Sequence, residues 1–390
     1  MQFKKLNLFP LYAVIFVAFL GYSMMIAIFT SLASQGSFKI TGDLRQFWLG
    51  FLLALYPLGQ CLGRPFILKL ANYYGKNRVY FISLIFTAIG YVCIGTSIDK
   101  NFIALSVSVF FTGLSESNIT IAAQTVTHVS LSLKRPELIS RIEGSIACAF
   151  FAGPLLSAWK APINPSRPFF IVAGILIVIC VSFVIRRLFS RLPEISIKMN
   201  DVSPFKTWQL GYIAPFILNF ALYFSIFGFF RAYPLHLDYY FNMDIRTLSL
   251  SITGVSVPII LVTFLVTHRL VKRFSEHKVA ATGALIIGVF MLLLPLIKTF
   301  GILLWICLIL IGAGIGLCLP VAPMLIAKVV RRWEREPVTE NDESWVLISE
   351  AISSFVGGIL GFILLDLPLF VFAGFALFAF SCLLIKIMKT

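Results

Sequence analysis

Acidic residues inside long apolar segments are the most chemically distinctive feature of this sequence. Glu116 lies within the apolar segment 102–127, and Glu350 lies within the segment 345–365. A charge in a hydrocarbon environment costs at least about 2.5–3.5 kcal/mol, so a carboxyl group at such a position usually has a function. Because a carboxyl group shielded from water favours its neutral form, it can bind and release a proton. We predict that both residues couple protons to the function of the protein.

Helical spacing gives these two acids polar neighbours. Glu116 shares one helix face with Thr112 and Thr120, and we expect this face to point into a central cavity. Glu350 shares a face with Ser354 in the same way. The alternative for Glu116 is a hydrogen bond that only holds two helices together. The alternative for Glu350 is a position near the helix end, from which the carboxyl group reaches water.

Two further charged residues are candidates. Glu143 is a third candidate for proton coupling, with an interfacial ion pair to Arg141 as the alternative. Arg231 keeps its charge at all relevant pH values and presents a fork of donors that suits carboxylate or phosphate groups. It therefore indicates an anionic substrate or a partner acid such as Glu116, and the alternative is that it extends to the membrane surface. The predicted substrate-binding residues are Arg231, Tyr223, Tyr22 and Thr120.

Transmembrane helices are the elements that must position these residues. Hydrophobic residues make up 59% of the 390 residues and charged residues only 13%, which is about half the charged share of a soluble domain. A helix that crosses a bilayer needs roughly 20 mostly apolar residues, and it satisfies its backbone hydrogen bonds internally. The sequence predicts an all-α integral membrane protein with twelve such helices, at residues 9–33, 47–68, 79–98, 102–127, 142–158, 168–188, 209–234, 247–267, 279–297, 300–327, 345–365 and 368–385.

The distribution of basic residues predicts the orientation of the chain. Lys and Arg concentrate in alternate loops, which places these loops and both termini in the cytoplasm. The polar stretch 189–207 lies between the sixth and seventh predicted helices and links two six-helix bundles, 1–188 and 208–390. This layout is typical of transporters with a solute site between two bundles. We expect a second polar stretch, 331–344, to be a solvated cytoplasmic loop.

The net charge of +15 does not indicate nucleic-acid binding, because the same orientation signals account for it. The partners we expect are the lipid bilayer, a small solute and protons, and we expect a monomer in the cell inner (plasma) membrane. The sequence contains no metal-ligand spacing, no phosphate loop and no HExxH or GxSxG motif. We therefore expect a transporter rather than an enzyme, with no metal and no cofactor.

The segment between the second and third predicted helices carries a family motif. It contains Lys69, Asn72, Gly75, Lys76 and Arg78. This pattern resembles the signature of the major facilitator superfamily, in which a helix end leads to an Asp, a Gly and a basic pair. In that family the Asp forms a latch that is closed in the outward-facing state. Asn72 replaces the Asp, so the resemblance implies an uncharged latch. The alternative is an ordinary cytoplasmic turn. It would explain the basic residues but not the spacing of the glycine.

A second motif lies in the predicted fifth helix. Gly144, followed after eight residues by Gly153 and Pro154, resembles the antiporter motif of the 12-helix drug:proton exporters of the same superfamily. Small residues let two helix backbones approach closely, and Pro154 bends its helix by removing a backbone donor. Generic small-residue packing is the alternative. The sequence departs from the family in the fourth helix, where Val109 stands in place of the usual Arg.

These observations predict a proton-coupled secondary transporter of a small organic solute that works by alternating access, as an exporter of drugs or metabolites. Arg231 supports an alternative, a transporter of an anionic polycarboxylate metabolite such as a carboxylate siderophore, in either direction. A membrane-embedded enzyme is the alternative from another class. It would need a convergent set of catalytic groups near one membrane surface, which the sequence does not contain.

Overall fold

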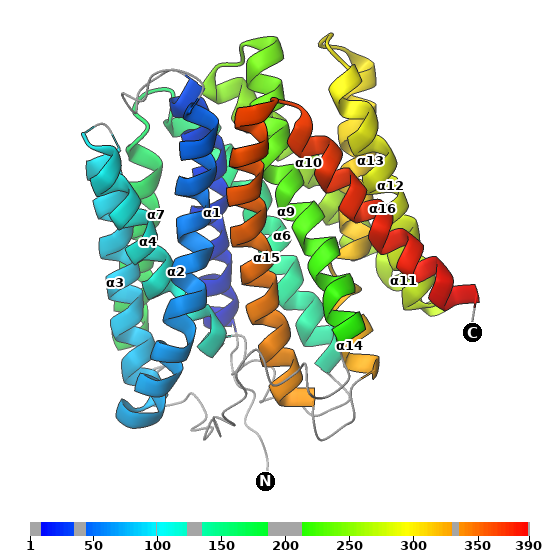
Figure 1. Cartoon of the computed structure of the whole chain (residues 1–390). Helices are drawn as coiled ribbons and strands as arrows, with labels where there is room; N and C mark the ends of the chain where they lie inside the picture. The colour runs from blue at the N-terminus through cyan, green and yellow to red at the C-terminus, as the bar shows by residue number, and fades with distance from the viewer. Residues whose placement is uncertain are drawn as a thin grey trace. The chain divides into compact units, whose positions relative to one another are not determined.

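The computed structural model describes residues 9–34, 44–98, 100–122, 135–185, 213–329 and 335–388, and every regular element in these ranges is a helix (Figure 1). The helices are α1 (Phe9–Ser34), α2 (Arg45–Tyr74), α3 (Lys76–Ser97), α4 (Phe102–Glu116), α6 (Arg135–Lys160), α7 (Arg167–Ile185), α9 (Ile213–Phe241), α10 (Ile245–Leu261), the π-helix η2 (Val262–Thr267), α11 (His268–Arg273), α12 (Glu276–Leu293), the 3-10 helix η3 (Leu294–Leu296), α13 (Ile302–Cys318), α14 (Ala322–Val329), α15 (Arg335–Ile363) and α16 (Leu367–Met388).

Helices lie at all the predicted segments, as far as the structure describes them. Within the described residues, 10 helices are long and apolar enough to cross a membrane. The helices α6 and α7 lie at the two other predicted positions. The all-helical prediction is therefore confirmed, and the number of crossings stays a prediction.

Several helix boundaries differ from the sequence-based expectation, among them the end of α2 at Tyr74, the start of α6 at Arg135, the end of α9 and the start of α15. We expected the seventh span to end at Pro234, but α9 continues through this proline to Phe241. Proline is tolerated in membrane helices because neighbouring groups satisfy the freed backbone carbonyl. The expected loop 331–344 was wrong in part, because α15 already begins at Arg335. Hydropathy detects only the apolar part of a helix, and a polar first section of α15 carries no such signal.

The chain forms two compact units. Unit 1 comprises Met1–Ile28 and Leu55–Lys198, and unit 2 comprises Phe29–Ala54 and Met199–Thr390. Each of the helices α1 and α2 therefore contributes one part to each unit.

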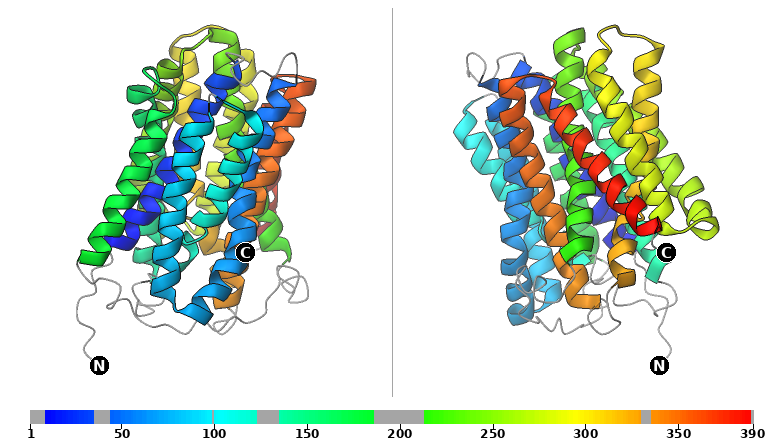
Figure 2. Two further views of the ribbon diagram at one scale, coloured as in Figure 1. Left: turned by 90° about the vertical axis from the view of Figure 1, so that its left-hand side faces the viewer. Right: turned by 45° about the vertical axis from the view of Figure 1, so that its right-hand side comes forward.

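In unit 1, α3 lies between α4 and α7 and packs against both (Figures 1 and 2). The helices α2 and α4 approach each other closely at Gly113, where a Cβ atom would clash with the backbone carbonyl oxygen of Tyr56. This close approach brings Glu116, at the end of α4, next to the polar side chains of α2.

In unit 2, α12 packs against α13 and α16, and α9 packs against α15 and α16 (Figure 2). The first half of α2 also belongs to this unit. It meets α15 at two glycines, because a Cβ atom on Gly50 would lie only 2.5 Å from the Cα atom of Gly358. A side chain on either residue would force the two helices apart.

Candidate functional site

Glu116 is held inside unit 1 by side chains from two other helices. It is only 1% exposed. The hydroxyl group of Tyr56 on α2 donates a hydrogen bond to its Oε2 atom. The hydroxyl group of Tyr91 on α3 lies 3.3 Å from Oε1 and 3.2 Å from Oε2. Gln60, one turn after Tyr56, donates to the Tyr56 hydroxyl oxygen at 3.2 Å. The carboxyl group is therefore surrounded by neutral polar groups and does not point into lipid.

This arrangement can accommodate both protonation states of Glu116. A phenol hydroxyl can donate to a carboxylate, and it can also accept from a protonated carboxyl group. In the part of the chain that the structure describes, no Lys or Arg forms an ion pair with Glu116. An ionised carboxylate is expensive to bury without a counter-charge. Loss of the proton in place therefore requires water or a cation to reach the group.

Two predicted substrate-binding residues lie near this carboxyl group. The ring of Tyr22 on α1 stacks on the ring of Tyr56, with 4.7 Å between the centroids. Thr120 is buried beyond a turn at Ser117 and Asn118, where the continuous helix α4 ends. The hydroxyl group of Ser117 donates to the backbone oxygen of Gln60 at 2.9 Å, which fixes this turn against α2.

A second charged cluster lies in unit 2. Arg231 on α9 and Glu350 on α15 are each 4% exposed in their side chains, and Nη2 of Arg231 lies 3.4 Å from Oε1 of Glu350. The Nε atom of Arg231 donates to the hydroxyl group of Ser354 at 2.7 Å. The predicted face of Glu350 and Ser354 is therefore the face that meets Arg231. Within unit 2, the acid in contact with Arg231 is Glu350.

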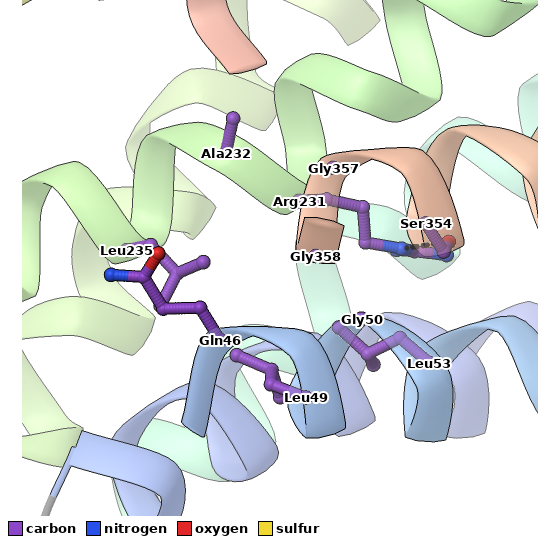
Figure 3. Close-up of a pocket in the computed structure, with 10 residues that line it drawn as sticks. All are labelled: Gln46, Leu49, Gly50, Leu53, Arg231, Ala232, Leu235, Ser354, Gly357 and Gly358. Atoms are coloured by element: carbon purple, nitrogen blue, oxygen red, sulfur yellow. Dashed lines mark hydrogen bonds between the residues drawn. The ribbon is translucent and has the colours of Figure 1, made fainter. Parts of the chain in front are cut away.

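Arg231 lines a small pocket between α2, α9 and α15 (Figure 3). The guanidinium group and Ser354 lie on one side, and most of the remaining wall is apolar. The pocket is lined by Gln46, Leu49, Gly50, Leu53, Arg231, Ala232, Leu235, Ser354, Gly357 and Gly358. The Oε1 atom of Gln46 is buried and has no hydrogen-bond partner in the described chain. The pocket thus offers a cation and an amide oxygen to a small polar group.

The remaining predicted site residues lie apart from these two clusters or outside the description. Tyr223 is buried on α9 and stacks on Phe227, with 5.9 Å between the ring centroids, and it does not line the pocket. Glu143 belongs to α6, but its side chain is outside the described part of the structure.

The predicted latch residues lie at the junction of α2 and α3. Gly75 separates the two helices with a φ angle of +89°, a conformation that favours glycine. A Cβ atom there would meet no atom within 4 Å, so the backbone conformation and not the available space requires glycine. Asn72 and Arg78 are exposed, and Lys76 is half-buried at the first position of α3.

The glycines of the second motif lie in α6. Gly153 packs directly against α1, where a Cβ atom would lie 2.5 Å from the backbone oxygen of Leu20. The hydroxyl group of Ser23 on α1 donates to the backbone oxygen of Ala149 at 3.0 Å. Pro154 lies inside the helix, and Gly144 is buried. The small residues therefore permit a close α1–α6 contact, as helix-packing rules predict.

Sequence reasoning missed several residues of the two clusters. It did not identify Tyr91 and Gln60 as partners of Glu116, or Gln46, Gly50 and Gly358 as parts of the pocket at Arg231. These residues come from other helices than the acid or base that they surround. Spacing within one helix gives no signal for such partners, although a polar side chain within an apolar span is a weak one.

Comparison with known proteins identifies the family. The family model of the Major Facilitator Superfamily matches residues 11–210 and 215–389. Quinolone resistance protein NorA of Staphylococcus aureus strain MRSA252 is 25% identical over 281 residues, which cover 69% of this chain and 68% of NorA. Multidrug resistance protein 1 of Bacillus subtilis is 21% identical over 282 residues, or 71% of this chain and 70% of the relative. Tetracycline resistance protein, class B, of Escherichia coli is 27% identical over 124 residues, which cover 32% of this chain and 30% of that protein.

A solved structure shows the same fold. The crystal structure of the human organic anion transporter MFSD10 (TETRAN) aligns with a TM-score of 0.74 and 14% sequence identity, over 98% of this chain and 100% of the other. The family match confirms that the chain is a transporter and not an enzyme. The chain belongs to the major facilitator superfamily and is a multi-pass transporter of the plasma membrane.

Proposed function

We propose that the protein is a proton-coupled exporter of drugs or chemically similar metabolites. The names of its relatives support drug export, because they are resistance proteins for quinolones, tetracycline or several drugs. The observation that carries proton coupling is the buried, phenol-bound carboxyl group of Glu116.

The proposed architecture has twelve membrane-spanning helices in two six-helix bundles, residues 1–188 and 208–390, joined by the linker 189–207. The excess of basic residues in alternate loops supports cytoplasmic positions for both termini. The protein acts as a monomer in which the bundles alternate access to a site near the middle of the membrane.

Proton coupling follows from the different surroundings of Glu116 in two states. In the packed state the carboxyl group is shielded, and its proton removes the cost of burying a charge. In a state open to water or to a cationic solute, the carboxylate is solvated or paired and the proton can leave. Because the two states bind the proton with different affinity, a proton gradient shifts their populations and drives the cycle.

Other residues assist this cycle. Glu143 is a further proton-coupling acid, Glu350 holds Arg231 in place through their ion pair, and Tyr22, Thr120, Tyr223 and Arg231 contact the solute. The change between the two states is controlled by residues at the α2–α3 junction and by residues of α6, the helix that packs against α1. These are Asn72, Gly75, Lys76, Arg78, Gly144, Gly153 and Pro154.

The test uses proteoliposomes with an imposed pH gradient and a panel of quinolones and other drugs. Wild-type protein should accumulate at least one of them, and a protonophore should abolish the accumulation. Glu116→Gln keeps the size and polarity of the side chain but cannot ionise. It should lose gradient-driven accumulation and retain exchange of labelled for unlabelled drug. Undiminished gradient-driven accumulation in this variant would remove Glu116 from the mechanism, and gradient-independent accumulation in wild-type protein would reject proton coupling.

A second candidate function rests on the pocket at Arg231. A buried guanidinium group beside a small pocket suits a carboxylate, which supports a polycarboxylate metabolite as the solute. Citrate-like anions should then inhibit transport, and Arg231→Lys should weaken the inhibition. Equal inhibition of both proteins, or no inhibition, would exclude this candidate.

A further inference from the structure

An exposed stripe along α2 changes from apolar to basic toward the end of the helix. Leu62, Phe66, Lys69 and Tyr73 are three or four positions apart, so their side chains lie on one face of α2. Leu62 is 61% exposed, Phe66 57% and Tyr73 81%, and Lys69 is also exposed. The rest of the described chain therefore leaves this face of α2 uncovered.

The charged side chains at this end of α2 and α3 are all positive. The two helices meet at Gly75, at their lower ends in Figure 1. Arg78 is exposed in the first turn of α3. Residues 44–98 contain no Asp or Glu, and the side chains of Lys69 and Arg78 form no ion pair or hydrogen bond with a described residue. Both cations are therefore available to an external anion.

The stripe has the length and composition of a path from the membrane interior to its surface. Leu62 and Lys69 are separated by about 10 Å along the helix axis. Tyr73 and the exposed Tyr74 form an edge-to-face pair with 4.7 Å between the ring centroids. Tyrosine rings are enriched where a bilayer meets water, and lysine side chains near a helix end extend to that level. The apolar part of the stripe then lies at the depth of the acyl chains, and Lys69 and Tyr73 lie at the level of the headgroups.

We propose that this face of α2 binds an anionic phospholipid, with the phosphate at the two unpaired cations and one acyl chain along the apolar part of the stripe. Lys69 and Arg78 form charge-assisted hydrogen bonds with the phosphate group. A cation near the membrane surface also attracts the net negative charge of such a headgroup. The acyl chain packs against the exposed side chains of Leu62 and Phe66, so the stripe contacts both parts of the lipid.

Two other occupants would use only part of this surface. A free phosphate ion would contact the cations and leave the apolar part of the stripe without a role. An acidic segment of another protein would also pair with the cations. Such a segment would not lie beside Leu62 and Phe66 at the depth of the acyl chains, because its backbone polar groups would have no partners in lipid. A phospholipid matches the cations and the apolar residues with one molecule.

The side of the membrane follows from the proposed orientation. With a cytoplasmic N-terminus, the junction of α2 and α3 faces the cytoplasm, and the lipid belongs to the inner leaflet. The cytoplasmic surface of a membrane is negatively charged, which agrees with an anionic lipid. Binding itself depends neither on this orientation nor on the transported solute, so it can be measured without transport.

Native mass spectrometry of the purified full-length protein in detergent measures lipid binding directly. The probes are phosphatidylglycerol, which is anionic, and phosphatidylcholine with the same acyl chains, which has no net charge. Wild-type protein should bind phosphatidylglycerol several-fold more tightly than phosphatidylcholine. Lys69→Ala and Arg78→Ala should each weaken the binding of phosphatidylglycerol about five-fold, the contribution of one cation near a membrane surface. Lys278→Ala is the matched control and should keep wild-type binding, because Lys278 is exposed on α12 but has Glu276 on the same helix turn.

Two further measurements test the apolar part of the site. Phe66→Ala should weaken the binding of phosphatidylglycerol, because it removes a contact with the acyl chain. Glycerol 3-phosphate carries the phosphate without acyl chains and should not displace phosphatidylglycerol at equal concentration. Displacement at equal concentration would identify a site for free phosphate and overturn the lipid proposal.

Two other results would also overturn it. Equal affinity for the two lipids would show that the headgroup charge is not recognised, and equal losses in Lys278→Ala and Lys69→Ala would show a general attraction without a site. All these side chains except the control lie on the exposed surface of unit 1, so the melting temperature in detergent should not change. Gradient-driven drug export by a protein without the lipid preference would reject this site and leave the proposed function in place. The lipid preference in a protein that exports no drug would do the opposite.

Discussion

The two units solve the problem of a buried carboxyl group in different ways. In unit 1, neutral hydroxyl groups of Tyr56 and Tyr91 surround Glu116. In unit 2, the guanidinium group of Arg231 faces Glu350. Hydrogen bonds from phenols do not neutralise a carboxylate, and no Lys or Arg of the described residues pairs with Glu116, so among these groups only a proton can neutralise it in the packed state. At Glu350 the guanidinium group of Arg231 neutralises the carboxylate, and a proton must compete with this permanent cation.

This difference separates two roles for chemically identical side chains. A carboxyl group without a cation partner changes its protonation when its surroundings change, which suits proton coupling. A carboxyl group in an ion pair holds its partner in a fixed position, and here it fixes Arg231 at the edge of the pocket (Figure 3).

Glu350→Ala should destabilise the protein by about 3–5 kcal/mol, because it leaves the charge of Arg231 buried without its carboxylate. Glu116→Gln should destabilise the protein much less, because this variant leaves no opposite charge buried without a partner. The free energy of unfolding in detergent micelles measures both. The double variant Arg231→Met/Glu350→Leu should recover most of the loss. Equal losses for Glu350→Ala and Glu116→Gln would break the comparison.

Tyr91→Phe should cost about 1.5–3 kcal/mol when Glu116 is ionised and about half of that when it is neutral, because hydrogen bonds to charged groups are stronger. The loss of stability should therefore grow as the pH rises. Unfolding measured across a pH series tests this sign. Tyr233→Phe is a matched control, since the Tyr233 hydroxyl has no partner in the described chain. A loss that does not change with pH would mean that Glu116 keeps one protonation state.

Gly358→Ala should destabilise the protein by about 1–3 kcal/mol through overpacking. Its Cβ atom would lie 2.9 Å from the Cα atom of Gly50, and backbone atoms cannot move aside as side chains do. Gly374→Ala on α16 is the control, because a Cβ atom there meets nothing within 4 Å. Equal stability of the two variants would show that α2 and α15 do not meet at this point.

Asp244 provides a third carboxyl group, which lies outside the membrane-spanning helices. It caps α10, and the hydrogen bond from Thr247 lowers the pKa of its carboxyl group. The carboxylate therefore stabilises the fold above the pKa of the unfolded chain, about 3.9, and this contribution disappears as the pH falls through the lower folded value. Asp244→Ala should cost about 1 kcal/mol at neutral pH. Asp244→Asn should keep the cap and remove its dependence on acidic pH.

Much of the fold could be predicted because a membrane helix consists of a long run of apolar residues, which is recognisable from that segment of the sequence alone. Apolar runs gave the positions of the helices, and the small residues near Pro154 indicated a close helix contact, which the structure shows at Gly153. The start of α15 at Arg335 escaped prediction, because polar residues in a helix leave no hydropathy signal. The continuation of α9 beyond Pro234 was not predicted. Whether a proline ends a membrane helix depends on the neighbouring helices, and the local sequence does not reveal these neighbours.

The sites were predictable only in part. The cost of burying a charge identified Glu116, Glu350 and Arg231 as unusual. The partners of these residues depend on which helices pack against each other. The spacing of residues within one helix does not reveal this. The hydrogen bonds of Tyr91 and the pairing of Arg231 with Glu350 join residues far apart in the sequence. Nothing in a single sequence marks such contacts without a set of related sequences.

The proposed transport cycle requires Glu116 to change its protonation state, and it does not require this of Glu350. Infrared difference spectroscopy of the reconstituted protein tests it most directly, because a protonated carboxyl group has a carbonyl band that a carboxylate lacks. Addition of a transported drug should remove such a band in wild-type protein and in Glu350→Gln, and no such change should occur in Glu116→Gln. A band change that persists in Glu116→Gln and vanishes in Glu350→Gln would show that Glu350, and not Glu116, exchanges the proton.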